Sequence, residues 1–286
     1  MTGLGGIVGG ATDVDLLALA VEAAERGGRF IRDERPDDLT AAATKTSPTD
    51  VVTAMDTACE RMLREHLLTA RPQDGIVGEE GDDVVGTSGV TWVVDPIDGT
   101  VNYLYGIPQY AVCVAAVAGD ARDPGGHEVL AGCVHSPVLG ETWTAARGGG
   151  AYLSVHGRER RPVRVRDGAP LGQVLLATGF GYQAERRRHQ AAVIAHLLPR
   201  VRDIRRIGCA ALDICSVASG RADAYLERGL KPWDLAAAGL VAREAGALVT
   251  GLGAAPAGEK LVVAAGPQVH AVLQAELAPL RPDTDG

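Results

Sequence analysis

The spacing of apolar and polar residues predicts a chain that begins with helices and short strands. Apolar positions recur at helical spacing over residues 13–34, where Thr12 or Asp13 is suited to be the N-cap, and a second helix is predicted over residues 53–68. Residues 75–80 and 90–95 are short apolar segments that end in acidic residues, so both are predicted to be strands. An apolar strand that ends in acids is most often surfacing into solvent.

Later parts of the chain change in pattern twice. Four apolar segments between residues 109 and 155 are separated by Gly, Pro and Asp, which predicts antiparallel hairpins. After residue 160, predicted strands (173–178, 201–207, 222–227, 260–266) alternate with predicted helices (187–198, 209–220, 234–246, 267–280). We therefore expect an α+β half over 12–155 and an α/β half over 156–286, layered together as one compact unit. The Gly-rich residues 1–11 are expected to be disordered.

Composition and charge favour a soluble globular protein. Of the 286 residues, 46% are hydrophobic and 22% charged, and the net charge of −8 argues against a nucleic-acid-binding surface. The basic runs 158–166 and 185–190 are interpreted as solvated faces. The five cysteines form no CxxC pair, so buried reduced thiols are favoured over disulfides or a zinc site. No signal-peptide pattern or membrane-length apolar run is found, so we expect a cytoplasmic protein without a membrane partner.

Acidic residues follow several of the predicted apolar elements. Glu79 and Glu80 end one strand, Asp95 and Asp98 end the next, and Asp234 begins a helix. If these carboxylates converge in a partly dry place they need a cation, and oxygen ligands alone favour Mg²⁺ or Mn²⁺ over zinc. For any one of these acids, a solvated loop position or a helix cap is the simpler alternative.

The segment "DPIDGT", residues 95–100, has a spacing suited to phosphate chemistry. Pro96 fixes φ directly after the strand, and Gly99 allows the backbone to approach a ligand closely. Asp98 and Thr100 then fall near the start of a turn or helix, where unpaired N–H groups can hold a phosphate oxygen. Metal-binding carboxylates and phosphate-binding amides would be neighbours.

Five motifs, in order, resemble the inositol monophosphatase family, whose members are metal-dependent, typically lithium-sensitive sugar-phosphate phosphatases. The matching segments lie at residues 45–56, 78–80, 95–103, 208–227 and 231–239. The resemblance implies a five-layered αβαβα sandwich, a homodimer, and a site with two or three Mg²⁺ ions, for which Mn²⁺ can substitute. Two such ions lie roughly 3.5–4 Å apart in sites of this kind.

The resemblance also implies roles for individual residues. The first metal is assigned to Glu79, Asp95 and the carbonyl of Ile97; the second is assigned to Asp95, Asp98 and Asp234; a weaker third lies near Glu79. Thr100 and Asp56 are implied to polarise the attacking water, with Glu79 assisting. Phosphate or substrate contacts are implied for Asp98, Gly99, Thr100, Gly208, Cys209, Ala210 and Glu227. Supporting roles near the metals are assigned to Lys45, Glu80 and Trp233.

The implied reaction is hydrolysis of myo-inositol monophosphate by metal-activated water. The same chemistry on histidinol phosphate, fructose bisphosphate or phosphoadenosine phosphate remains open, because "KPWD" (residues 231–234) resembles a bacterial subgroup. An aspartyl-phosphate phosphatase of the haloacid dehalogenase type is disfavoured, since its acids are separated by one residue and these by two. A regulatory protein that retains the fold is the alternative from a different class. Asp213, on an apolar helix, is expected to pair with an arginine.

Overall fold

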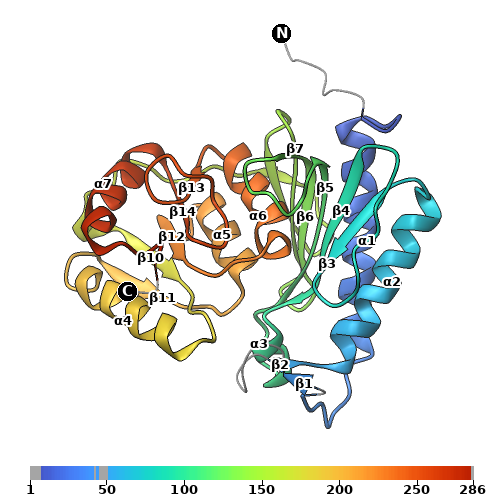
Figure 1. The fold of residues 1–286 in the computed structure, drawn as a ribbon, viewed down its shortest axis with the longest axis horizontal. Coiled ribbons are helices and arrows are strands. Elements are labelled where there is room, and N and C mark those ends of the chain that lie inside the picture. The colour runs from blue at the N-terminus through green and yellow to red at the C-terminus, as the bar shows by residue number, and fades with distance from the viewer. Residues whose placement is uncertain (1–7, 42, 45–50, 285–286) are drawn as a thin grey trace.

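Five alternating layers of helix and sheet make up the protein, in a computed structural model that describes residues 8–41, 43–44 and 51–284. Figure 1 shows these layers edge-on, with two long helices on one side, two sheets, a pair of helices between the sheets, and two helices on the far side. The expected αβαβα sandwich is thereby confirmed. Of the residues expected to be disordered, 1–7 lie outside the described part, and Val8 forms an isolated bridge with Ala11.

The first sheet has seven strands. In the order in which they pair they are β3 (Gly75–Gly78), β4 (Val90–Asp98), β5 (Ala111–Gly119), β6 (His127–Ser136), β7 (Glu141–Ala146), β8 (Ala151–Val155) and β9 (Arg161–Pro162). The β3–β4 pair is parallel and every other pair is antiparallel, so the predicted hairpins are confirmed.

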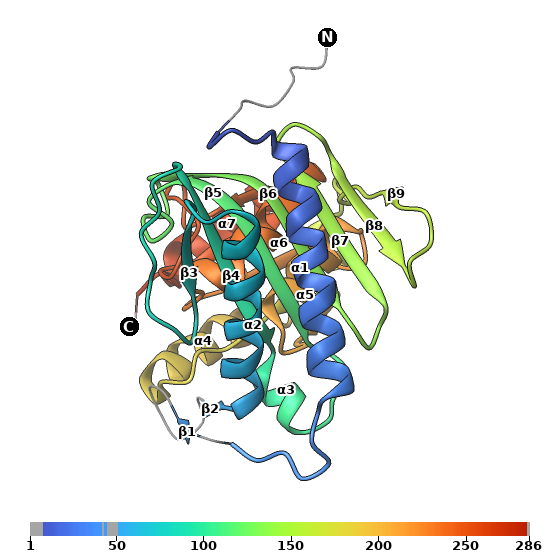
Figure 2. The same ribbon diagram turned by 90° about the vertical axis from the view of Figure 1, so that its right-hand side faces the viewer.

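Helices cover both faces of this sheet, which explains why its strands are apolar on both sides. Along β5, Val112 and Val114 pack in the core shared with α1 (Asp13–Asp33) and α2 (Ala54–Ala70). The intervening Cys113 and Ala115 pack in the core shared with α5 (Ala210–Ala218) and α6 (Pro232–Glu244). Figure 2 shows α1 and α2 lying across the outer face of the sheet. Successive side chains of a strand point to opposite faces, so a continuous apolar run marks a sheet buried on both sides.

The second sheet has five shorter strands. In pairing order they are β11 (Asp203–Arg205), β10 (Leu175–Thr178), β12 (Ala224–Glu227), β14 (Val262–Ala265) and β13 (Leu248–Thr250). The first three are parallel, whereas β14 is antiparallel to both of its neighbours. Its outer face is covered by α4 (Ala184–Leu197) and α7 (Pro267–Leu277). The division of the chain near residue 155 stays a prediction.

The remaining elements are short. They are β1 (Ala43–Thr44), β2 (Val51–Val52), α3 (Thr100–Leu104) and two 3₁₀ turns, Leu171–Gln173 and Ala278–Leu280. Strands β9 and β13 were not predicted, and α4 begins three residues earlier than the predicted position 187. All five cysteines are buried and free, as expected. Among the described residues, no helix is both long and apolar enough to cross a membrane.

Candidate metal centre and active site

The end of β4 brings Asp95 and Asp98 to the same side of the sheet. The prediction that this strand ends at Asp95 is wrong, because β4 continues to Asp98. Side chains three positions apart in a regular strand point to opposite faces. Here Asp95 pairs with Cys113 and Asp98 pairs with Ala111, so β4 carries one more residue than β5 across this interval. This β-bulge returns both carboxylates to one face, and both are buried.

Helix α5 starts directly at the Asp98 carboxylate. The amides of Ala210 and Ala211 donate to Asp98 oxygens at 3.3 and 2.6 Å, and the Cys209 thiol donates to Oδ2 at 3.2 Å. Burial raises the pKa of Asp98 above its ordinary value, and the Ala211 amide opposes that rise. The amides at the start of a helix favour negative charge. They hold this carboxylate in place.

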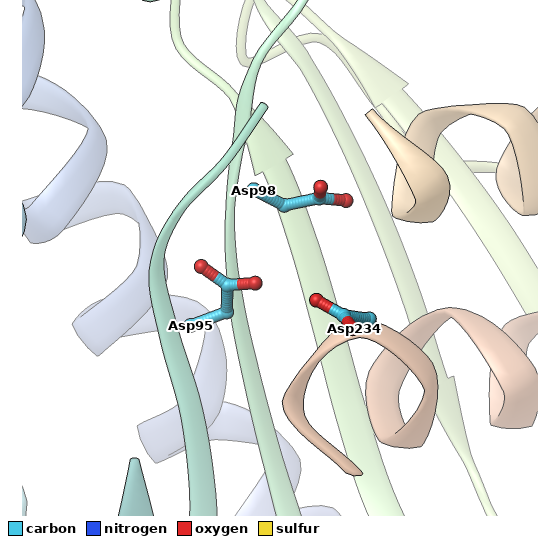
Figure 3. A group of neighbouring side chains, drawn as sticks. All are labelled: Asp95, Asp98 and Asp234. Carbon is cyan, nitrogen blue, oxygen red and sulfur yellow. The ribbon is translucent and has the colours of Figure 1, made fainter. Parts of the chain in front are cut away.

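Asp234 completes a cluster of three carboxylates. It lies in the first turn of α6, where its Oδ2 accepts the Lys231 amide at 2.6 Å. One oxygen each from Asp95, Asp98 and Asp234 falls within 4.8 Å of the others, and Figure 3 shows the three side chains pointing toward a common space. Burial, and then the charge of Asp98, raise the pKa of Asp234 well above its usual range. Carboxylates this close are suited to share a hard divalent cation.

Asp56 and Thr100 form a hydrogen-bonded pair beside this cluster. The Thr100 hydroxyl lies 3.0 Å from Asp56 Oδ1 and 3.1 Å from the Ile97 carbonyl oxygen. Asp56 is fully buried at the start of α2, where its Oδ2 accepts both the amide and the hydroxyl of Thr53. The geometry therefore joins two residues that are 44 positions apart in the sequence.

Glu79 is positioned by a residue that sequence reasoning missed. The buried Glu60 carboxylate accepts the amides of Glu80 and Gly81 at 2.7 and 2.8 Å, and it pairs with Arg64 at 2.8 Å. These bonds fix the turn that carries Glu79. Glu79 lines the same cavity as the aspartates but is not part of the group within 4.8 Å. Glu60 lies four residues after Asp56 in α2, so helical spacing could have indicated it.

A cavity of about 450 Å³ extends from the cluster toward the second sheet. Its lining includes nearly all of the expected site residues: Glu79, Asp95, Ile97, Asp98, Gly99, Thr100, Gly208, Cys209, Ala210, Glu227, Trp233 and Asp234. Asp56 and Glu80 are not among its lining residues. Lys45 lies outside the described residues. Arg186, from a basic run expected to be a solvated face, lines this cavity as well.

Two further carboxylates lie on the side of the cavity away from the aspartate cluster. Glu227, at the end of β12, accepts the Tyr225 hydroxyl, and burial raises its pKa to about 7. Asp213 on α5 is 1% exposed, and burial and then the charge of Glu227 raise its pKa to about 8. The expected ion pair of Asp213 is wrong, since no described arginine pairs with it and its Oδ1 has no hydrogen-bond partner. These groups offer polar contacts to the non-phosphate part of a ligand.

Comparison with known proteins agrees with this geometry. Residues 13–283 match the model of the inositol monophosphatase family. The chain belongs to the inositol monophosphatase family. It is 45% identical over 248 residues to an inositol-1-monophosphatase of Mycobacterium bovis, a match that covers 82% of this chain and 83% of the relative. A protein named Nus factor SuhB from Vibrio cholerae is 35% identical over 237 residues, with 82% and 84% covered.

Solved structures confirm the inositol monophosphatase fold. SuhB of Mycobacterium tuberculosis superimposes with a TM-score of 0.79 at 42% identity, covering 95% of this chain and 99% of that one. An inositol monophosphatase of Thermotoga maritima gives a TM-score of 0.79 at 28% identity, covering 93% and 98%. With the family established, the chain is a phosphatase, and its acidic cluster is suited to the metal dependence that is general in this family.

Proposed function

We propose that this protein is a Mg²⁺-dependent hydrolase that converts myo-inositol monophosphate and related polyol phosphates to the polyol and inorganic phosphate. The observation that carries the proposal is the convergence of Asp95, Asp98 and Asp234 within 4.8 Å, beside the hydrogen-bonded pair Asp56–Thr100. Relatives named inositol-1-monophosphatase, at 45% identity, support the choice of substrate.

The donor atoms fit a hard divalent ion. One ion would be held by Asp95, Asp98 and Asp234, and a second by Asp95, Glu79 and the Ile97 carbonyl, so Asp95 would bridge the two ions. A third ion would bind more weakly beside Glu79. Every one of these donors is an oxygen, which favours Mg²⁺, with Mn²⁺ as a substitute. When bound, such ions lower the pKa of a nucleophilic water and stabilise charge on the phosphate and on the leaving alkoxide.

The protein's own residues orient the attacking water. Because the Thr100 hydroxyl donates toward Asp56 Oδ1, its lone pairs remain available to accept a hydrogen bond from water. Asp56 is held at both of its oxygens, so the proton acceptor beside Thr100 is fixed in position. The amides of Gly99 and Thr100, at the start of α3, are proposed to bind the phosphate; Gly99 has a φ of 96°, which glycine adopts without strain.

The polyol would face the carboxylates of Glu227 and Asp213 and the backbone strip Gly208–Cys209–Ala210. Carboxylates accept hydrogen bonds from hydroxyl groups, which suits a sugar-like alcohol. A Cβ added at Gly179 would lie 1.9 Å from a Glu227 oxygen, so the backbone at Gly179 packs directly against this carboxylate. Histidinol phosphate, fructose bisphosphate and phosphoadenosine phosphate are the alternative substrates for the same chemistry.

The proposal includes a cytoplasmic, lithium-sensitive homodimer without a nucleic-acid partner. Tyr105 and Ile107, next to α3, are 75% and 43% exposed, which supports an apolar contact with a second copy near the site. The net charge of −8 supports the absence of a nucleic-acid partner. Glu79, Asp95, Asp98, Thr100 and Asp234 are all present, which supports catalysis over a purely regulatory role.

Phosphate release tests the proposal directly. Purified protein is assayed with and without Mg²⁺ on inositol monophosphate, glycerol 2-phosphate and the three alternative substrates. We expect Mg²⁺-dependent release with the highest kcat/KM on inositol monophosphate. Asp95→Asn should abolish turnover while circular dichroism stays unchanged, and Asp15→Asn, on the exposed first turn of α1, should turn over like the wild type. Near-wild-type rates in Asp95→Asn would refute the bridging role, and absence of release from every substrate would refute the activity.

A further inference from the structure

A second cavity, of about 600 Å³, lies next to the catalytic one. Its walls come from the β5–β6 connection with the first residues of β6 (121–129), the start of α6, the β13–β14 connection (251–261), and single residues of α4 and the end of α6. Arg186, Arg228, Leu230, Lys231 and Glu259 line both cavities, so the two adjoin. A volume of roughly 300–1,000 Å³ is typical of small-molecule sites. We call this space the basic cavity.

The charge of this lining is opposite to that of the whole protein. Six cationic side chains line the basic cavity: Arg122, Arg186, Arg228, Lys231, Arg243 and Lys260. Two carboxylates face them, Glu259 and Asp283. Glu259 binds Lys231 at 2.8 Å and Asp283 binds Arg281 at 3.0 Å. Asp83, outside the lining, binds Arg122 at 2.6 Å, so at least two of the six cations are compensated. The chain as a whole carries a net charge of −8, so this concentration of positive charge is local.

Arg243 is a cation of the basic cavity for which the described residues supply no counter-charge. In the last turn of α6, its guanidinium makes one long hydrogen bond, 3.4 Å to the Val249 carbonyl oxygen. No described carboxylate pairs with Arg243 or with Lys260. The Arg243 side chain is exposed, so a carboxylate or phosphate can reach its guanidinium directly.

We propose that the basic cavity binds a small molecule carrying two or more phosphate groups. Lys231 and Arg243 stand at opposite ends of α6, twelve residues apart, so the cationic groups are spread over roughly 18 Å of helix. A ligand with charge at more than one point matches that spread better than a single phosphate. The guanidinium group of Arg243 supplies the flat, forked donors that phosphate oxygens accept. Arg122 is already in a bidentate pair with Asp83 and contributes only its charge at the rim.

Binding to this cavity can be measured separately from catalysis. Arg243 and Lys260 line the basic cavity and not the catalytic one, whose four cations (Arg186, Arg206, Arg228 and Lys231) lie among seven acidic residues. Inorganic tripolyphosphate titrated calorimetrically into EDTA-treated full-length protein should therefore bind once per chain, more weakly as salt is raised. This result does not depend on phosphatase activity, so the present proposal and the proposed function fail separately.

Matched variants locate the site. Arg243→Gln should weaken tripolyphosphate binding about tenfold, which equals about 1.4 kcal/mol, and Arg243→Lys, which keeps the charge, should restore most of it. Arg158→Gln removes the same charge from an exposed position that lines neither cavity, and it should bind like the wild type. Lys260→Gln provides an independent test if Arg243→Gln lowers the melting temperature.

The proposal would be overturned by the absence of saturable binding, by an equal loss of affinity in Arg243→Gln and Arg158→Gln, or by unchanged affinity in both Arg243→Gln and Lys260→Gln. Binding of single-stranded oligonucleotides without binding of tripolyphosphate would also overturn it, because the cavity would then be part of a macromolecular surface.

Discussion

Asp234→Asn should make the metal-free protein more stable than the metal-free wild type. The same substitution should reduce the stabilisation that Mg²⁺ gives. In the wild type, Asp234 lies within 4.8 Å of Asp95 and Asp98 oxygens. Two unit charges at that separation repel by about 3.5 kcal/mol at an effective dielectric constant of about 20. Proton uptake limits this cost, so we expect Asp234→Asn to gain about 2–3 kcal/mol in EDTA. For a chain of this size that corresponds to a melting temperature higher by roughly 3–5 °C.

The substitution suits the local structure. Asp234 Oδ2 accepts the Lys231 amide, and an asparagine oxygen can accept the same bond while its NH₂ donates toward the other two carboxylates. Asp15 provides a matched control, because it occupies the same position of α1 and accepts the Thr12 amide at 3.0 Å, but it is exposed. Asp15→Asn loses a favourable charge at a helix start and should lower the stability slightly in EDTA and in Mg²⁺ alike.

The pH dependence has a definite sign. The pKa of Asp234 is raised in the folded state, so the folded protein keeps a proton that the unfolded chain releases. Wild-type stability in EDTA should therefore fall as pH rises from about 4 toward that raised pKa, and Asp234→Asn should flatten the fall.

Thermal unfolding followed by circular dichroism, in EDTA and in Mg²⁺, measures both effects. Mg²⁺ should raise the melting temperature of the wild type and of Asp15→Asn well above that of Asp234→Asn, because a ligand stabilises the state that binds it. The reasoning is refuted if Asp234→Asn is destabilised in EDTA as much as Asp15→Asn, or if Mg²⁺ stabilises both variants equally.

Three further predictions concern single side chains. Thr100→Ala should lower kcat about 10²–10⁴-fold, while Thr100→Ser, which keeps the hydroxyl, should stay within about tenfold of the wild type; equal loss in both would contradict the role of the hydroxyl. Glu60→Gln, which weakens the hold on the turn carrying Glu79, should weaken Mg²⁺ activation about 10–100-fold. It should also lower the melting temperature in EDTA, because Arg64 loses its buried partner and an amide loses its acceptor. Asp213→Asn should be more stable than the wild type by an amount that grows as pH rises from about 4 to about 8. The raised pKa of Asp213 means that ionising it costs the folded wild type at most about 1.4 kcal/mol for each pH unit. A difference in urea unfolding that does not change with pH would contradict this.

The sequence predicted the layers well because they follow from periodic patterns. Helices α1 and α2 begin at Thr capping residues with an apolar face behind them, and both were located to within about two residues. Strand β13 was missed because three residues, of which Leu248 is 44% exposed, are too short to show a period. Pairing with β14, which no local pattern reveals, makes Leu248–Thr250 a strand.

Most residues of the matching motifs lie around one cavity, as their spacing suggested, and their roles stay predictions. The long-range contacts of the site were not predicted. The bulge between Asp95 and Asp98 cannot be read from spacing, since an extra residue shifts the side-chain alternation without changing composition. Asp213 looked like half of an ion pair, but whether an arginine reaches it depends on tertiary packing. The contact of Cys209 with Asp98, 111 residues apart, is likewise set by the fold.

Main-chain groups keep the acidic cluster in place when no ion is bound. Helices α5 and α6 both begin beside the end of β4, and their first turns hold Asp98 through the Ala210 and Ala211 amides and Asp234 through the Lys231 amide. The partial positive charge of each helix start offsets part of the repulsion among the carboxylates. Because these donors belong to the backbone of packed helices, removal of metal should leave the ligand geometry intact. EDTA-treated protein should therefore regain full phosphatase activity on addition of Mg²⁺ without refolding, and a slow recovery with a change in circular dichroism would show that the ion, rather than the helix starts, organises the site.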